Sequence, residues 1–186
     1  MGSLIYAALC SLDGYVEDSQ GDFSWAQPRE DLHRFINHLD SKIDMLLFGR
    51  KMWEIMTYWD SDLTDVPDYI QDYSHIWKKT PKIVFSRTMK AVTFPRTELR
   101  QSFDPEEVRS LKNRTQGNLG IGGAELASVA MAHGLVDELY LFYFPVLVGA
   151  GKVFIFEKIK HSLFLKETEV FEGGVVLLHY QVDNNR

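Results

Sequence analysis

The stretch Asn118–Ala127 reads NLGIGGAELA and decides the fold. A short apolar run stops at two consecutive glycines, and a helical pattern follows at once, with Leu126, Val129 and Ala130 at i, i+3, i+4 spacing. We therefore predict a strand that runs directly into a helix. Glycine at such a turn lets the backbone approach a ligand closely, and the first N–H groups of the helix attract anions. A Gly-Gly pair is also a common tight turn, so a phosphate site needs support from the rest of the chain.

Length and composition set the limits for that interpretation. The chain has 186 residues, 45% of them hydrophobic and 25% charged, which is typical of a globular protein with one domain over residues 1–186. A net charge of −6 argues against a general nucleic-acid binder, which needs a basic face. The single cysteine, Cys10, lies in an apolar run, which favours a structural role in a reduced compartment. Neither a membrane span nor a signal peptide is evident, so we expect a cytoplasmic protein without a membrane partner.

Apolar runs and turn signals outward from the central stretch predict an α/β fold. Strand-length runs alternate with helical patterns through the first two thirds of the chain, which indicates parallel strands joined by helices. The last two strands meet at Gly173-Gly174, a tight hairpin signal, and must be antiparallel. We predict a mixed, mainly parallel sheet with helices on both faces and an antiparallel C-terminal hairpin. The predicted strands are Leu4–Cys10, Ile43–Phe48, Lys82–Phe85, Asn118–Ile121, Leu139–Phe144, Val146–Val148, Val153–Phe156, Leu163–Phe171 and Val175–Val182.

Three of these strands end in residues that suit phosphate groups. Gly49 and Arg50 follow one strand, Ser86-Arg87-Thr88 follows the next, and Gly122-Gly123 follows the third. The C-terminal ends of parallel strands form the edge at which open α/β sheets bind ligands. Together the three ends predict a site for a phosphorylated nucleotide. The glycine-rich Rossmann fingerprint and the Walker loop are both missing, which argues against those two phosphate-binding folds.

The segment from Ser11 to Pro28 is long, polar and glycine-containing, and it carries aromatic residues that include Trp25. A long loop of this kind is often functional. It is predicted either to form a lid over a pocket or to be pinned to the core by its aromatic side chains. Asp31 follows in the first turn of the helix that Pro28 opens, where it could point into a cleft or act as an ordinary capping residue.

The ordered motifs resemble those of the dihydrofolate-reductase-like family. Five segments carry the likeness: LCSLDG at Leu9–Gly14, LFGRKMWE at Leu47–Glu54, VFSRT at Val84–Thr88, GIGGAELA at Gly120–Ala127 and PVLVGAGK at Pro145–Lys152. Within the family, the chain is most similar to the reductase domain of the bifunctional riboflavin-biosynthesis deaminase-reductase and its stand-alone bacterial relatives. The resemblance covers nearly the whole chain.

The resemblance implies a dihydrofolate-reductase-like fold with NADPH as cofactor and no metal. The paired glycines and the following helix would hold the pyrophosphate, and the arginines and hydroxyls would select NADPH over NADH. Ala8, Val16 and Ile121 would flank the nicotinamide. The cofactor-binding residues so implied are Ala8, Val16, Gly49, Arg50, Lys51, Ser86, Arg87, Thr88, Ile121, Gly122, Gly123, Ala124 and Glu125.

The reaction implied is hydride transfer to a small pterin-like or ribosylaminopyrimidine-like substrate, with an activity of the 5-amino-6-(5-phosphoribosylamino)uracil reductase type. Asp31 and Asp13 are the candidate acids or substrate anchors, because such a step needs a proton source. Asp31 stands, in chain order, where dihydrofolate reductases place their pterin-binding carboxylate, and Trp25 is the second candidate for substrate binding.

Two departures from the family pattern affect the expected site. Met52-Trp53 stands where the family more often has Thr-Tyr, which removes one hydroxyl contact to the cofactor, and Ala150 stands where glycine is usual. The alternatives are therefore a non-catalytic NADP-binding protein and a dimeric structural module. A homodimer is expected from the family likeness, supported by alternating aromatic residues such as Phe142 and Phe144.

Overall fold

The structure is a computed structural model, and it describes residues 2–156 and 159–184. The strands are β1 (Leu4–Ser11), β2 (Tyr15–Asp18), β3 (Ile43–Gly49), β4 (Lys82–Phe85), β5 (Thr97–Arg100), β6 (Asn118–Gly122), β7 (Glu138–Phe144), β8 (Gly151–Val153), β9 (Leu163–Val170) and β10 (Val176–Val182). The helices are α1 (Glu30–Asp40), α2 (Arg50–Met56), α3 (Asp68–Lys79), α4 (Pro105–Arg114) and α5 (Ala124–Ala132), with short 3₁₀ helices η1 (Thr57–Asp60) and η2 (Glu172–Gly174). No helix in the described part of the chain is long and apolar enough to cross a membrane.

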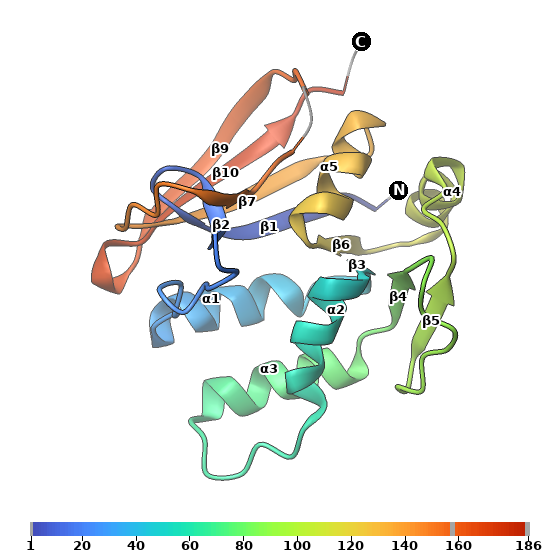
Figure 1. Cartoon of the computed structure of the whole chain (residues 1–186), viewed down its shortest axis with the longest axis horizontal. Helices are drawn as coiled ribbons and strands as arrows, with labels where there is room; N and C mark the ends of the chain where they lie inside the picture. Colours follow the sequence, from blue (N-terminus) through green and yellow to red (C-terminus); the bar gives the residue numbers. More distant parts are fainter. Residues whose placement is uncertain (1, 157–158, 185–186) are drawn as a thin grey trace.

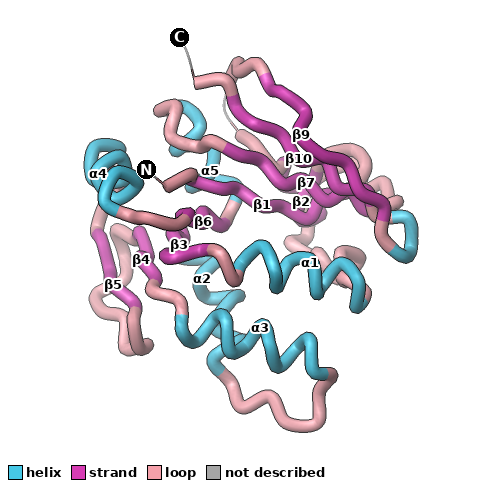
Figure 2. Tube along the Cα trace, turned by 180° about the vertical axis from the view of Figure 1, so that it is seen from behind, coloured by secondary structure: helices cyan, strands magenta, loops and turns pink. Residues whose placement is uncertain are grey.

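The main sheet has eight strands in the order β5-β4-β3-β6-β1-β7-β10-β9. The strands from β5 to β7 are parallel, and β10 then runs antiparallel to both β7 and β9. The short strands β2 and β8 pair separately as an antiparallel ribbon. Figures 1 and 2 show β10 and β9 at the far end of the sheet from β4 and β5, and α1 packs against β7 and β10 through Leu32 and Phe35. The predicted mixed sheet with an antiparallel C-terminal hairpin is confirmed.

Helices cover both faces of the parallel half of the sheet. Helices α4 and α5 pack on one face, where Val108 and Ala127 join the strand residues in one core cluster. Helices α1, α2 and α3 pack on the other, where Trp53 and Trp77 join a second cluster (Figure 2). Each fully buried large apolar side chain contributes about 1.5–3 kcal/mol to folding, so these two clusters hold the strand ends of the parallel half in place.

Some observed strands differ from the predicted ones, because pairing with other strands decides where they form more than the local sequence does. Strands β2 and β5 were not predicted, because each has only four residues and mixes polar with apolar side chains. They form by pairing with β8 and β4. Val146–Val148, predicted as a strand, is a loop because its Val148 N–H is bonded to the Asp13 carboxylate. Helix α1 begins at Glu30, two residues after Pro28.

Candidate functional site

The three predicted phosphate-binding strand ends lie side by side. Strand β3 is hydrogen-bonded in parallel to β4 on one side and to β6 on the other. Gly49 is in register with Phe85 of β4, and Phe48 is in register with Gly122 of β6. The three strand-to-helix or strand-to-loop junctions therefore open on the same edge of the sheet, at the base of α2 and α5 (Figure 1).

Two of these junctions are in direct contact. Arg50 donates from Nη1 to the Thr88 hydroxyl at 3.0 Å, and its Nε donates to Glu54 at 2.7 Å. Ser86 is buried, and its hydroxyl accepts the N–H of Met89 at 3.1 Å, which fixes the turn after β4. Arg50 therefore lies across the turn with an exposed guanidinium, available to an anion beyond Thr88.

Arg87 and Lys51 add positive charge at the same edge. Both side chains are exposed. Within residues 2–156 and 159–184, neither forms a salt bridge. These two cations can therefore meet an anionic ligand without first breaking an internal ion pair.

The Gly122-Gly123 pair is required by the packing and also leaves a helix end open. A Cβ on Gly122 would lie 2.3 Å from the Phe48 ring, so that position admits only glycine without rearrangement. Gly123 has φ +95° and is the N-cap of α5, with no side-chain cap bond. The first N–H groups of α5, including those of Ala124 and Glu125, thus lack a capping side chain, as an anion-binding helix end requires.

Ala8 and Ile121, the residues expected beside a nicotinamide, belong to one core cluster. Both are buried, and Val16 of β2 packs against the same cluster. Strand β1 lies between β6 and β7, so Ala8 stands between the glycine pair and the C-terminal half of the sheet. Val16 belongs to β2, which lies against β1 (Figure 1).

Asp13 anchors a loop. Its carboxylate accepts hydrogen bonds from the Ser11 hydroxyl at 2.7 Å, from Gly149 N–H at 2.7 Å and from Val148 N–H at 3.1 Å. These bonds, led by that of Ser11, lower the pKa of Asp13 to about 2. The group is therefore ionised at neutral pH, which favours a positioning role over that of a proton donor.

Asp31 ties α1 to the turn between β9 and β10. One carboxylate oxygen accepts Leu32 N–H at 2.8 Å, and the other accepts Glu172 N–H at 2.6 Å. Both oxygens are thus occupied by backbone donors. Asp31 thereby fixes the turn at residues 171–175, which forms one wall of the adjacent pocket.

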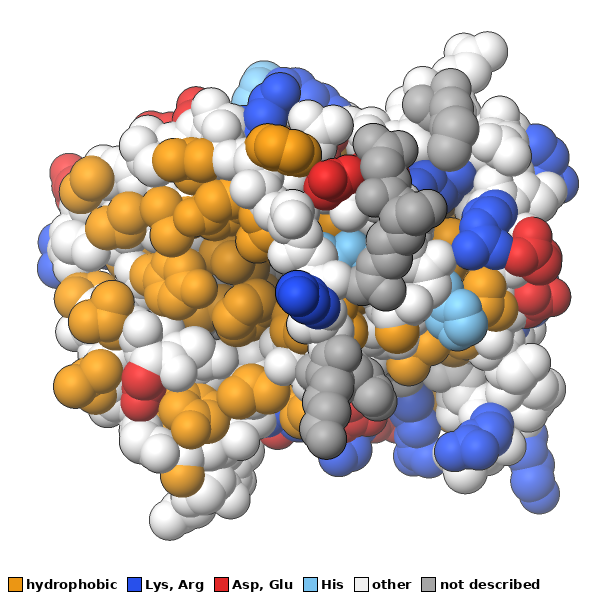
Figure 3. All heavy atoms as spheres, turned by 90° about the horizontal axis from the view of Figure 1, so that it is seen from above, with side chains coloured by type: hydrophobic (Ala, Val, Ile, Leu, Met, Phe, Trp, Pro, Cys, Tyr) orange, Lys and Arg blue, Asp and Glu red, His pale blue; other side chains and the backbone are white. Residues whose placement is uncertain are grey.

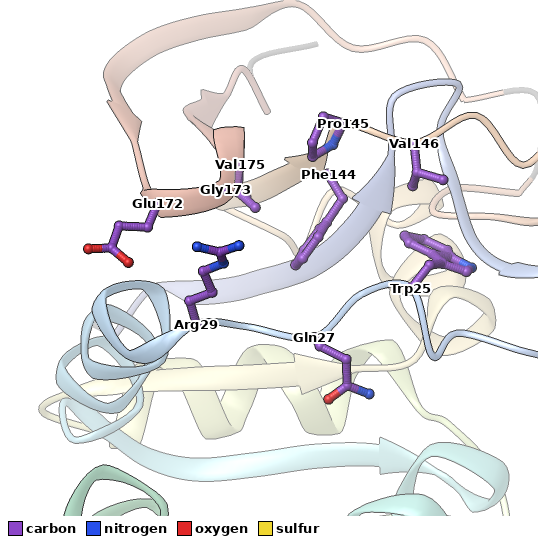
Figure 4. Close-up of a pocket in the computed structure, with 9 residues that line it drawn as sticks. All are labelled: Trp25, Gln27, Arg29, Phe144, Pro145, Val146, Glu172, Gly173 and Val175. Carbon is purple, nitrogen blue, oxygen red and sulfur yellow. The ribbon is translucent and has the colours of Figure 1, made fainter.

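A pocket of about 200 Å³ opens between the end of β7, the segment before α1 and the β9–β10 turn (Figure 4). Its lining residues are Trp25, Gln27, Arg29, Phe144, Pro145, Val146, Glu172, Gly173 and Val175. Trp25 contacts Phe144 edge to face, with ring centroids 6.2 Å apart. Arg29 fits against Gly173, where a Cβ would lie 3.1 Å from its Nε. The pocket thus combines aromatic walls with one guanidinium, one amide and one carboxylate, those of Arg29, Gln27 and Glu172.

Of the pocket residues, sequence reasoning had selected Trp25 alone. The others come from three separate segments, and only Pro145 and Val146 belong to a motif that the sequence had marked. The sequence contained only a weak indication that Gln27 and Arg29 line a pocket, which was their position between the candidate lid and the start of a helix. Within the described residues, no group of three or more His, Cys, Asp or Glu side chains is arranged to hold a metal ion.

Comparison with known proteins places this geometry in a family. YyaP of Bacillus subtilis, an uncharacterised protein, is 31% identical over 172 residues, 91% of this chain and 89% of its own. A second uncharacterised B. subtilis protein, YwjB, is 28% identical over 96% of each chain.

Solved structures share the fold at lower identity. A proposed riboflavin biosynthesis protein from Shewanella sp. PV-4 has a TM-score of 0.78 at 21% identity, with 97% of this chain and 99% of the other covered. Dihydrofolate reductase from Enterococcus faecalis, complexed with NADP(H), has a TM-score of 0.64 at 17% identity, covering 98% and 97%. The sequence itself matches the RibD C-terminal domain over residues 3–177. The chain therefore belongs to the RibD C-terminal domain family.

Proposed function

We propose that this protein is an NADPH-dependent reductase of a small heterocyclic substrate. The observation that carries the proposal is the convergence of three neighbouring strand ends on one edge of the sheet, with Arg50 bonded to Thr88 and the open end of α5 beside them. The bare backbone of the glycine pair and the uncapped helix suit a diphosphate, and Arg50 and Arg87 suit a further phosphate. Met52, which lies against Gly123, supplies no hydroxyl to this site.

The substrate would occupy the pocket at Trp25 and Phe144. Strand order places β1 between the cofactor edge at β6 and the pocket at β7. Because the Trp25 and Phe144 rings lie at 76° to each other, a flat ring in the pocket would stack on one of them and meet the other edge to face. Gln27 and Arg29 would bind its polar groups. A substrate of the pterin or ribosylaminopyrimidine class has this combination of a planar ring and polar edges.

The chain's own residues would act by positioning and by excluding water. NADPH, when bound, supplies a hydride from C4 of its nicotinamide. Ala8, Ile121 and Val16 would form an apolar surface at that end of the site, which keeps the reacting atoms dry and aligned. Asp13 and Asp31 would hold the walls of the pocket through their backbone bonds. The proton would then come from solvent at the pocket mouth.

Absorbance at 340 nm tests the proposal directly. The purified protein is mixed with NADPH and a panel of pterins, 5-amino-6-(5-phosphoribosylamino)uracil and simple carbonyl compounds. Loss of absorbance that depends on both protein and substrate is the expected result. A protein that neither binds NADPH by calorimetry nor oxidises it with any member of the panel would refute the proposal.

A second candidate function is non-catalytic NADP binding. One observation favours it. The carboxylate oxygens of both candidate acids, Asp13 and Asp31, already accept hydrogen bonds from backbone N–H or hydroxyl groups. In that case NADPH would bind with a saturable heat change, and no substrate of the panel would oxidise it.

We further propose that two copies of the chain associate through the exposed sheet end. The aromatic alternation that suggested this in β7 is misleading, because Phe142 and Phe144 are buried in the core. The exposed apolar residues lie on β9 instead, where Leu165 is 55% and Val170 72% exposed. Hydrophobic side chains gather over this part of the molecule in Figure 3.

Light scattering after gel filtration tests the dimer. The expected mass is twice 21.5 kDa, and Leu165→Glu is expected to shift it toward a single chain, because a charge on that face cannot be buried. A wild-type mass of 21.5 kDa at micromolar concentration would contradict the proposal.

A further inference from the structure

Lys152 links the β2–β8 ribbon to the open end of α5. Its Nζ lies 2.7 Å from a carboxylate oxygen of Glu17 on β2 and 3.6 Å from one of Glu125 in the first turn of α5. The Lys152 side chain is only 21% exposed, whereas that of Glu125 is 68% exposed. In the described part of the chain, Lys152 is the only cation paired with Glu125.

The ribbon is built to deliver Lys152 to this place. Strands β2 and β8 pair with Glu17 opposite Lys152 and Asp18 opposite Gly151. A Cβ on Gly151 would lie 2.0 Å from the Glu17 carbonyl oxygen, and its φ is +150°, so the close approach depends on glycine. Gly151 therefore allows the two strands to approach closely, and this approach brings Lys152 next to Glu17.

The charges around this lysine are unbalanced. Burial works against its ammonium, but the hydrogen bond and charge of Glu17, with the charge of Glu125, outweigh burial and raise the pKa of Lys152. It therefore stays protonated at neutral pH. Two carboxylates face one ammonium beside a helix end that attracts anions. A diphosphate at the start of α5 would lie next to Glu125 and be repelled by it unless a cation intervened.

We propose that Lys152 is a diphosphate-binding residue of the dinucleotide site: its ammonium leaves Glu125 and pairs with the diphosphate when the cofactor binds, while Glu17 keeps the lysine in place. This inference rests on the proposed function, because it needs a dinucleotide at α5. The longer of its two ion pairs, at 3.6 Å, is the one that must break, and it is weak because Glu125 is exposed. Because NADPH and NADH carry the same diphosphate, a contact of Lys152 with that group does not distinguish between them.

Calorimetric titration of wild type and matched variants with NADPH and with NADH tests this role. Lys152→Met is expected to weaken binding of both dinucleotides about tenfold, the loss of one charge-assisted contact. Lys152→Arg, which keeps the charge, is expected to retain most of the affinity. Glu125→Gln is expected to tighten binding of both dinucleotides, because the repelling charge is gone. Lys79→Met, at the exposed end of α3 on the opposite face of the sheet from α5, is the control and is expected to bind as wild type.

Two comparisons separate a direct contact from a structural one. Glu17→Gln breaks the same ribbon ion pair but leaves the ammonium, so it is expected to weaken binding clearly less than Lys152→Met does. If the two variants lose the same affinity, the lysine acts through the ribbon and the proposal fails. In the Glu125→Gln background, Lys152→Met must still weaken binding about tenfold. If that loss disappears, Lys152 merely offsets Glu125, and the proposal fails. Wild-type protein that binds neither dinucleotide would instead overturn the proposed function itself.

Discussion

The β4–β3–β6 edge of the sheet, where we propose that the cofactor binds and which we call the cofactor edge, is built differently from the pocket beside β7. At the cofactor edge, the groups that would bind a ligand are backbone N–H groups and exposed cations, all within a few residues of a strand end. At the pocket, the charged groups Asp13 and Asp31 are used to join segments more than 130 residues apart. The first region is a local consequence of the parallel sheet, and the second is a product of long-range assembly.

The glycine pair gives the sharpest test of the cofactor edge. Gly122→Ala places a Cβ 2.3 Å from the Phe48 ring, so we expect the free energy of unfolding to fall by about 1–3 kcal/mol and NADPH binding to be lost. Urea denaturation and calorimetry measure the two effects. Gly49→Ala is the control for stability alone, because its Cβ would lie 3.9 Å from Leu126 and its φ is −74°. A Gly122→Ala protein as stable as wild type would show that the packing argument is wrong.

Asp31 gives the corresponding test of the pocket. Asp31→Ala removes two backbone hydrogen bonds, so we expect the free energy of unfolding to fall by about 1–2 kcal/mol with no change in NADPH affinity. Glu30→Ala, which removes an exposed pair with Arg34 from the same helical turn, is expected to change stability by less than about 0.5 kcal/mol. Unchanged stability with abolished turnover would instead make Asp31 the proton donor.

Arg87 tests which part of the cofactor edge discriminates between cofactors. Arg87→Gln is expected to weaken NADPH binding about tenfold and to leave NADH binding unchanged, because only NADPH carries the extra phosphate. Titration with both nucleotides gives the ratio of dissociation constants. Lys90→Gln, in the following exposed loop, is the control. Equal losses for the two nucleotides would place Arg87 at the diphosphate or outside the site.

Replacing Asp13 is expected to have the smallest effect of these changes, and the pH dependence of the reaction rate tests its role. Its pKa falls from 3.8 in an unfolded chain to about 2, so its contribution to stability is complete above pH 3.8 and is lost as the pH falls through 2. We therefore expect Asp13→Asn to leave the shape of the pH–rate profile near neutrality unchanged. Hydrogen exchange at the Val148 and Gly149 amides should be faster in this variant. Loss of one limb of the profile would identify Asp13 as a titrating acid.

The sequence predicted that the three strand ends at β3, β4 and β6 share one edge of the sheet, for a physical reason. Strand β4 has the predicted bounds, because Lys82–Phe85 lies next to a clear turn signal. The β9–β10 hairpin was likewise predicted from Gly173-Gly174, which lie in the turn between the two strands. Each of these features depends on residues that are close together in the chain.

The rest could not be predicted from local patterns. Strand β5 is polar and forms because β4 offers an edge, and Lys82 becomes buried because its Nζ donates to the Thr80 and Trp77 carbonyls at the end of α3. The bonds of Asp13 to Val148 and of Asp31 to Glu172 join opposite ends of the chain. The sequence marked both aspartates as polar residues near a ligand site, but their partners are known only once the sheet has assembled.

The central claim is that three neighbouring strand ends bind one dinucleotide. Backbone amide chemical shifts, followed by NMR during titration with NADPH, test it most directly. The predicted result is that the amides of Arg50, of Arg87 and Thr88, and of Gly123 and Ala124 shift together with a single dissociation constant, while those of α3 remain unchanged. Shifts confined to one of the three strand ends, or different dissociation constants for them, would contradict the account.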